Sequence, residues 1–224
     1  MADFESNPYT VDLEFPGTTD LIPDVSGQRV LDAGSGSGRY GAWLLDAGAA
    51  EVVAVDASPA MLDVARDRLG ERAEALDGTV EFHRSDLADG LEFAAADAFD
   101  GVVCGLVLHY LEDWRPTFEE FARVLRPGGF VVFSVSHPAD EFPLEAAESY
   151  FATRQKTKEW TVEIPDDARP FSARVNPVLD AGFRLEEIVE PEPTEGFREK
   201  RPDRYETESR HPVFVAFRFV LPPD

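Results

Sequence analysis

The stretch that decides the fold of this chain is Val30-Leu-Asp-Ala-Gly-Ser-Gly-Ser-Gly38, in which glycines and serines alternate directly after an apolar segment. Residues 29–33 predict a short apolar strand, and residues 39–47 predict a helix. Glycine lets the backbone turn sharply and approach a ligand closely. The N-terminus of the helix offers unpaired N–H groups to an anionic group. The stretch therefore predicts an anionic or zwitterionic ligand that carries a nucleoside.

Strands and helices continue to alternate after this loop. Further strands are predicted at 51–56, 79–83, 99–104 and 130–135, and further helices at 58–69 and 114–125. Such alternation favours a mostly parallel sheet with helices on both faces. Ligands bind such sheets at the carboxyl ends of the strands.

The alternation stops after His137. Residues 138–170 are rich in charge, aromatic rings and proline, with no clear strand–helix unit. A helix at 176–181 and strands at 183–189 and 213–220 are predicted beyond them, and a polar, proline-bearing stretch joins these two strands. We expect one domain over 1–224, with an irregular N-terminal extension at 1–27 that holds at most short helices.

A dinucleotide site is an alternative reading of the same loop. Residues 36–41 satisfy the fingerprint GxGxxG, and Asp56 follows about 20 residues later, as NAD-binding chains require. However, Asp32 stands at the end of the strand, where it would repel a pyrophosphate but could order the loop and attract a cationic ligand. The glycine that closes the turn is Gly34, and no second mononucleotide half is evident later in the chain.

The stretch VLDAGSGSG resembles motif I of the class I S-adenosylmethionine (SAM)-dependent methyltransferases. The resemblance continues over about 110 residues, through VVAVDASPAML (52–62), SDL (85–87), FDGVVCGLVLHYLED (99–113) and VLRPGGFVVFSVSHP (124–138). It implies a Rossmann-like, seven-stranded, mostly parallel sheet with a closing antiparallel hairpin and SAM as the cofactor.

The resemblance also implies roles for single residues. Asp56 would hold both ribose hydroxyls, Met61 would lie near the adenine, and Asp86 would bond the adenine amino group. The expected cofactor-binding residues are Asp32, Gly34, Ser35, Gly36, Gly38, Asp56, Ala57, Met61, Asp86, Leu87, Cys104, Gly105 and Leu106.

Two histidines are candidates for a catalytic base. His109 and His137 follow the strands at 99–104 and 130–135, near the expected acceptor, and a histidine can take a proton near neutral pH. Methyl transfer from a sulfonium needs little acid–base help, so orientation of the acceptor can supply most of the rate. No metal site is expected, because the four histidines and the single cysteine form no metal-ligand spacing.

Residues 138–175 resemble the lid-like insertion of small-molecule methyltransferases, including RPFS at 169–172. This segment carries aromatic residues at Phe142, Tyr150, Phe151, Trp160 and Phe171, and basic residues at Arg154, Lys156 and Lys158. A long irregular segment at this place is usually functional. We expect it to close the acceptor pocket.

The net charge is −23, from 44 acidic and 21 basic residues, and lysine occurs only at Lys156, Lys158 and Lys200. The acids are spread over the whole chain, which favours adaptation to high salt over an acidic surface for a basic partner. This predicts a cytoplasmic protein from a halophilic, archaeal source. Such a charge disfavours nucleic acid as a partner, and neither a signal peptide nor a membrane span is expected.

The sequence therefore predicts a SAM-dependent methyltransferase that acts on a small molecule. The attacked atom (O, N, C or S) and the oligomeric state are left open. The alternatives are an NAD-binding Rossmann oxidoreductase and a non-catalytic protein that keeps the SAM fold to bind a partner. The intact glycines and acids argue against the second alternative, because such a protein has no need of them.

Overall fold

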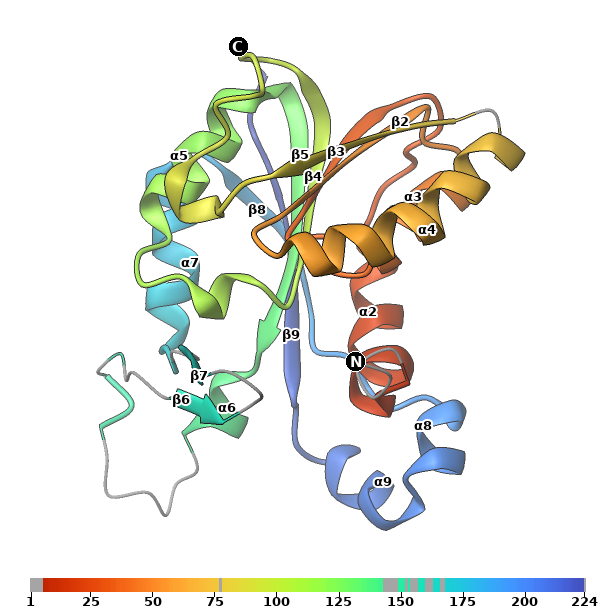
Figure 1. Ribbon diagram of the computed structural model, residues 1–224. Helices are drawn as coiled ribbons and strands as arrows, with labels where there is room; N and C mark the ends of the chain where they lie inside the picture. Colours follow the sequence, from red (N-terminus) through yellow and green to blue (C-terminus); the bar gives the residue numbers. More distant parts are fainter. Residues whose placement is uncertain are drawn as a thin grey trace.

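The computed structural model describes residues 6–76, 78–142, 149–151, 153, 157–159, 163–165 and 168–223. A twisted central sheet runs through the molecule, with helices on both of its faces (Figure 1). No helix in these ranges is long and apolar enough to cross a membrane.

Seven strands of the described chain form the central sheet, in the order β3-β2-β1-β4-β5-β9-β8. The strands are β1 (Arg29–Ala33), β2 (Glu51–Asp56), β3 (Thr79–Arg84), β4 (Phe99–Gly105), β5 (Leu125–Ser136), β8 (Arg184–Val189) and β9 (Phe214–Val220). Neighbouring strands are parallel, except that β9 is antiparallel to both β5 and β8. The predicted Rossmann-like sheet with an antiparallel closing hairpin is confirmed.

The helices divide between the two faces of the sheet (Figure 1). Those that pack on the sheet are α2 (Phe15–Thr19), α3 (Arg39–Asp46), α4 (Pro59–Leu76), α5 (Arg115–Val124) and α7 (Phe171–Asp180). Apolar residues of α2, α3 and α4 pack on one face, and those of α5 and α7 pack on the other. Because both faces are covered, the central parts of β1, β2, β4 and β5 are buried and mostly apolar, as is typical of buried parallel strands.

Two helices are longer than the sequence predicted. Helix α4 continues past residue 69 to Leu76, because its buried face continues through Leu62, Ala65, Leu69 and Ala73. Gly70 does not end it, since a Cβ at Gly70 would meet no atom within 4 Å and the residue lies away from the packed face. Helix α7 begins at Phe171 instead of 176, so the last residues of the expected lid are helical.

The stretch between β8 and β9 contains two helices that the sequence did not indicate, α8 (Glu195–Lys200) and α9 (Pro202–Glu208). Both are short and polar, so they lack a clear apolar period. Phe197 of α8 is fully buried against Leu13 of the N-terminal π-helical turn η1 (Thr10–Glu14). The N-terminal extension is therefore packed against the end of the chain.

The structure describes both ends of the expected lid at 138–175. It begins with α6 (Pro138–Glu141) and contains a short antiparallel pair, β6 (Thr157–Glu159) and β7 (Glu163–Pro165). Phe142 is buried and Phe151 is exposed. Arg154, Lys156 and Trp160 lie outside the described residues, so the lid remains a prediction.

Candidate cofactor and acceptor site

The candidate site lies where β1, β2, β3 and β4 end, at the carboxyl edge of the sheet. The glycine loop connects β1 to α3, and each of its glycines at 34, 36 and 38 has a positive φ, of 75°, 52° and 79°. Side chains rarely tolerate this conformation. The alternating glycines are therefore required by the backbone of the turn itself.

Contacts around this loop differ from one glycine to the next. A Cβ at Gly34 would lie 2.3 Å from a methyl carbon of Val107, so the loop touches the segment that follows β4. A Cβ at Gly36 would meet nothing within 4 Å, which leaves open space above the loop. The hydroxyl of Ser35 is buried and has no hydrogen-bond partner among the described residues. The loop therefore has open space beside Gly36 and an unused hydrogen-bonding group at Ser35.

Asp32 lies beneath the loop with 1% of its surface exposed. Its Oδ2 accepts a hydrogen bond from the Gly41 N–H at 2.8 Å, which ties the end of β1 to the first turns of α3. Burial raises the pKa of Asp32 to about 7, and the negative charge of Asp56 acts in the same direction. Asp32 therefore joins β1 to α3, the two elements that the loop connects, and its role at the cofactor stays a prediction.

Asp56, at the end of β2, connects the glycine loop to the start of α4. Its Oδ2 accepts from the Gly36 N–H and its Oδ1 accepts from the Ser58 N–H, both at 2.8 Å. A carboxylate oxygen can accept more than one hydrogen bond. Each oxygen thus keeps capacity for a ligand hydroxyl, and the expected role at the ribose remains a prediction that this geometry permits.

The remaining adenosine-side residues follow β2 and β3. Asp86 is exposed and caps the short helix η2 (Leu87–Asp89), since its Oδ1 accepts from the Ala88 N–H at 3.0 Å. Leu87 is buried in the core, and Met61 is half-buried in the first turn of α4. Ala57 is exposed at the end of β2. Their contacts with adenine remain predictions.

The end of β4 is closely packed. Cys104 is fully buried in the core and burial raises the pKa of its thiol well above the usual range, which argues against a nucleophile. Gly105 has no room for a side chain, because a Cβ would lie 2.1 Å from a ring carbon of Tyr40. Leu106 has a φ of 54°, and its N–H donates to the Ser134 carbonyl at 3.0 Å. Because its side chain is fully buried, Cys104 can contact the cofactor only through its backbone.

The two histidines have different surroundings. His109 is buried in the short helix η3 (Leu108–Tyr110), with its ring 4.0 Å from that of Tyr110. His137 caps α6: its Nδ1 accepts from the Ala139 N–H at 3.0 Å, and its Nε2 lies 2.7 Å from Glu190 Oε1. Burial lowers the pKa of His137, and Glu190 opposes that change. Because both of its ring nitrogens are engaged, His137 would have to give up a contact to act as a base.

The structure reveals a buried arginine cluster that sequence reasoning missed. Arg174 is fully buried and donates to Glu141 and to the carbonyl oxygens of Ser136 and Arg169, at 2.6 and 2.9 Å. Arg169 in turn donates to the carbonyls of Leu111 and Glu112, just after η3, at 2.6 and 2.7 Å. The cluster therefore joins α7, α6 and the end of η3, the helix that carries His109. The only signal in the sequence was the RPFS match at 169–172.

A second group was also missed. Glu14 is buried near the ends of β4 and β5 and bonds to Tyr40 and Ser134. No local pattern in the N-terminal extension indicates this carboxylate, because its partners lie 26 and 120 residues away.

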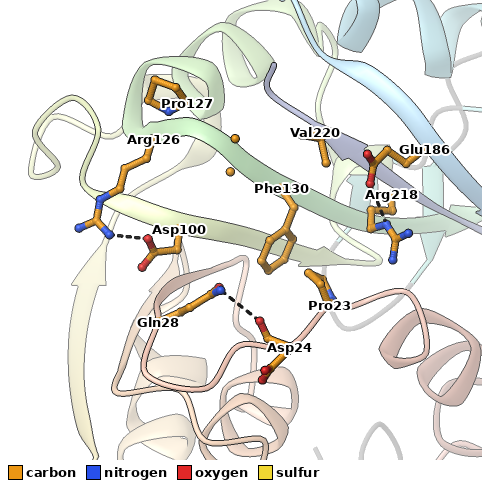
Figure 2. Close-up of a pocket in the computed structure, with 12 residues that line it drawn as sticks. Pro23, Asp24, Gln28, Asp100, Arg126, Pro127, Phe130, Glu186, Arg218 and Val220 are labelled. Atoms are coloured by element: carbon orange, nitrogen blue, oxygen red, sulfur yellow. Dashed lines mark hydrogen bonds and ion pairs between the residues drawn. The ribbon is translucent and has the colours of Figure 1, made fainter. Parts of the chain in front are cut away.

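A cavity of about 470 Å³ lies at the opposite, amino edge of the sheet, and Figure 2 shows residues that line it. Its two arginines are already paired: Arg126 forms an ion pair with Asp100, and Arg218 Nε lies 3.3 Å from Glu186. This cavity is separate from the glycine loop. No group of three or more metal-ligating side chains is found among the residues that the structure describes.

Comparison with known proteins supports this interpretation of the loop. A protein family described as "Methyltransferase domain" matches residues 31–133. A demethylmenaquinone methyltransferase from Clavibacter sepedonicus is 41% identical over 115 residues, which are 51% of this chain and 44% of that protein. The matched part thus spans less than half the length of this relative. An uncharacterized Haemophilus influenzae protein is 22% identical over 83% of this chain and 80% of its own length.

Among solved structures, a SAM-dependent methyltransferase from Mesorhizobium loti superposes with a TM-score of 0.72. It is 26% identical to this chain, and the match covers 92% of this chain and 97% of the other. Residues 31–133 therefore match a methyltransferase domain, and nearly the whole chain has the fold of a SAM-dependent methyltransferase, which together point to SAM as the cofactor.

Proposed function

We propose that this chain transfers the methyl group of SAM to a small-molecule acceptor. One observation carries the proposal: the glycine loop, Asp56 and Asp86 lie at or just beyond the ends of three adjacent strands, β1, β2 and β3. An extended nucleoside ligand fits such a row, since its hydroxyl and amino groups would meet the carboxylates of Asp56 and Asp86.

The chain's own residues would bind and orient the reactants. The bound cofactor supplies a methyl carbon activated by its sulfonium group. Asp56 would hold the ribose, the open space above Gly36 would admit the cofactor backbone, and the Ser35 hydroxyl would gain a partner. Holding an acceptor in line with the methyl group is the main catalytic requirement, because effective molarity from orientation alone can be very large. A base such as His109 is needed only for an acceptor that must lose a proton.

Two observations support a small-molecule acceptor. The matched relative from Clavibacter sepedonicus is named for a small-molecule substrate, demethylmenaquinone. The net charge of −23 also disfavours the phosphate backbone of a nucleic acid. We propose only the class of acceptor and leave its identity to experiment.

The NAD alternative is disfavoured by the sheet. A dinucleotide-binding sheet has two mononucleotide halves in the order 3-2-1-4-5-6, all parallel. Here β9 is inserted antiparallel between β5 and β8, so the second half is missing. A non-catalytic role remains the second candidate, and turnover of SAM to S-adenosylhomocysteine (SAH) would exclude it.

Calorimetric titration tests the cofactor. We expect the protein to bind SAM and SAH and to bind NAD far more weakly. Asp56→Ala should weaken SAM binding about tenfold or more, since hydrogen bonds to a charged group contribute about 1.5–3 kcal/mol each. The matched control is Asp63→Ala, which removes an exposed acid of α4 that pairs with Arg66. Tighter binding of NAD than of SAM, or equal affinities for both variants, would contradict the proposal.

A further inference from the structure

Glu14 is a fully buried carboxylate at the end of η1. Its Oε1 accepts hydrogen bonds from three hydroxyls, those of Thr18 at 3.0 Å, Tyr40 at 2.5 Å and Ser134. The three hydroxyls belong to α2, α3 and β5. The carboxylate is therefore fixed in place by three separate elements.

The other oxygen of this carboxylate is not used within the described chain. Glu14 Oε2 is buried and has no hydrogen-bond partner among the described residues. A buried acceptor without a partner destabilises the protein, because it has lost its hydrogen bonds to water and no protein group replaces them. Burial raises the pKa of Glu14, while its three hydroxyl partners and the charge of Arg39 lower it. Oε2 is thus an acceptor that a ligand's donor group would satisfy.

The Glu14 cluster lies at the ends of β4 and β5. Ser134 pairs in register with Gly105, the last residue of β4. The Ser134 hydroxyl also accepts from the Leu106 N–H at 3.2 Å, and the ring of Tyr40 packs directly on Gly105. The carboxylate is therefore attached to the same edge of the sheet as the glycine loop.

The order of the strands indicates which part of the cofactor reaches this place. In the proposed site, adenosine lies over the ends of β3 and β2, beside Asp86 and Asp56, and the chain of the cofactor passes Gly34 at the end of β1. The next strand in the sheet is β4. The amino-acid end of the cofactor would then arrive beside Gly105, next to Glu14. That end carries an ammonium group, and charge-assisted hydrogen bonds are the strongest that a carboxylate accepts.

We propose that Glu14 Oε2 binds the α-ammonium group of SAM and of SAH, as a positioning residue for the amino-acid end of the cofactor. This inference rests on the proposed function. The hydroxyls of Thr18, Tyr40 and Ser134 hold Oε1 and leave Oε2 for the ligand. The N-terminal extension thereby becomes part of the cofactor site.

The test compares two ligands on Glu14→Gln by calorimetry. SAH carries the ammonium group, whereas 5′-methylthioadenosine has the same nucleoside and thioether without the amino-acid group. We expect the substitution to lower the affinity for SAH about tenfold or more. The affinity for 5′-methylthioadenosine should change by less than about twofold. Asp12→Asn is the matched control, because it removes an equal charge from the same turn, where the Asp12 side chain bonds Lys200 instead. This control should leave the affinities for both ligands unchanged.

Equal losses of affinity for both ligands would show that Glu14 only supports the fold. No loss of affinity for either ligand would show that Glu14 does not contact the cofactor. Both results overturn the inference. If Glu14→Gln does not fold, Ser134→Ala keeps the carboxylate and removes one hydroxyl that holds it. We then expect a smaller loss, still confined to SAH, and an unselective loss or none overturns the inference. Failure of the unaltered protein to bind SAM at all would instead refute the proposed function.

Discussion

At the scale of a single residue, burial changes the pKa of Asp32, the acid beneath the glycine loop. Its carboxyl group titrates near pH 7 in the folded protein and near pH 4 in an unfolded chain. Between these values the folded state holds a proton that the unfolded state has lost, so stability falls as pH rises from about 4 to about 7. Asp32→Asn removes this dependence and keeps an acceptor for the Gly41 N–H.

We therefore expect Asp32→Asn to gain stability relative to the unaltered protein as pH rises. The gain between pH 4.5 and 7.5 should be roughly 2–4 kcal/mol, since one pKa unit corresponds to about 1.4 kcal/mol. Urea denaturation of the ligand-free proteins at both pH values measures it. Comparing the two proteins at each pH cancels the other buried acids. If the difference in free energy of unfolding between the two proteins does not change with pH, Asp32 is ionised throughout this range.

At the scale of elements, the buried arginine cluster joins α6, α7 and the end of η3. Arg174→Met should destabilise the protein by about 3–5 kcal/mol, because it removes the buried guanidinium that forms an ion pair with Glu141. Adding Glu141→Gln should recover part of that loss. Arg184→Met is the control: it breaks an exposed ion pair with Glu186 and should cost less than about 1 kcal/mol. Equal losses in both single variants by urea denaturation would contradict this view of the cluster.

The lid is an element whose ends the structure defines. Phe142 and Ala168 are buried, so a replacement that spares the fold must lie between them. We predict that a short Gly-Ser linker in place of residues 143–167 leaves SAM affinity within about threefold, because the cofactor residues are on other elements, while transfer to the acceptor is lost. Calorimetry and a SAH-release assay measure the two effects. Transfer at the parental rate would disprove the lid.

At the scale of the whole molecule, the net charge of −23 predicts a strong response to salt. Self-repulsion destabilises a compact chain of one sign, and the screening length shrinks from about 30 Å at 0.01 M to about 3 Å at 1 M salt. The melting temperature should therefore rise markedly with KCl over that range. Sucrose at equal osmolality is the control for effects that do not involve charge. A melting temperature unaffected by KCl would argue against adaptation to high salt.

The sequence by itself determined the alternating strands and helices, the glycine loop, the acid that ends β2 and the acid that follows β3. These are local properties: burial sets the apolar runs, and a backbone with positive φ demands glycine, so neighbouring residues report them. Only the tertiary structure decided that Glu14 meets Ser134 and that Arg174 meets Glu141. A buried polar side chain is satisfied by whatever the topology brings to it, and nothing in the adjacent sequence specifies that partner. The short helices α8 and α9 were missed for a related reason, since Phe197 is buried by a segment from the other end of the chain.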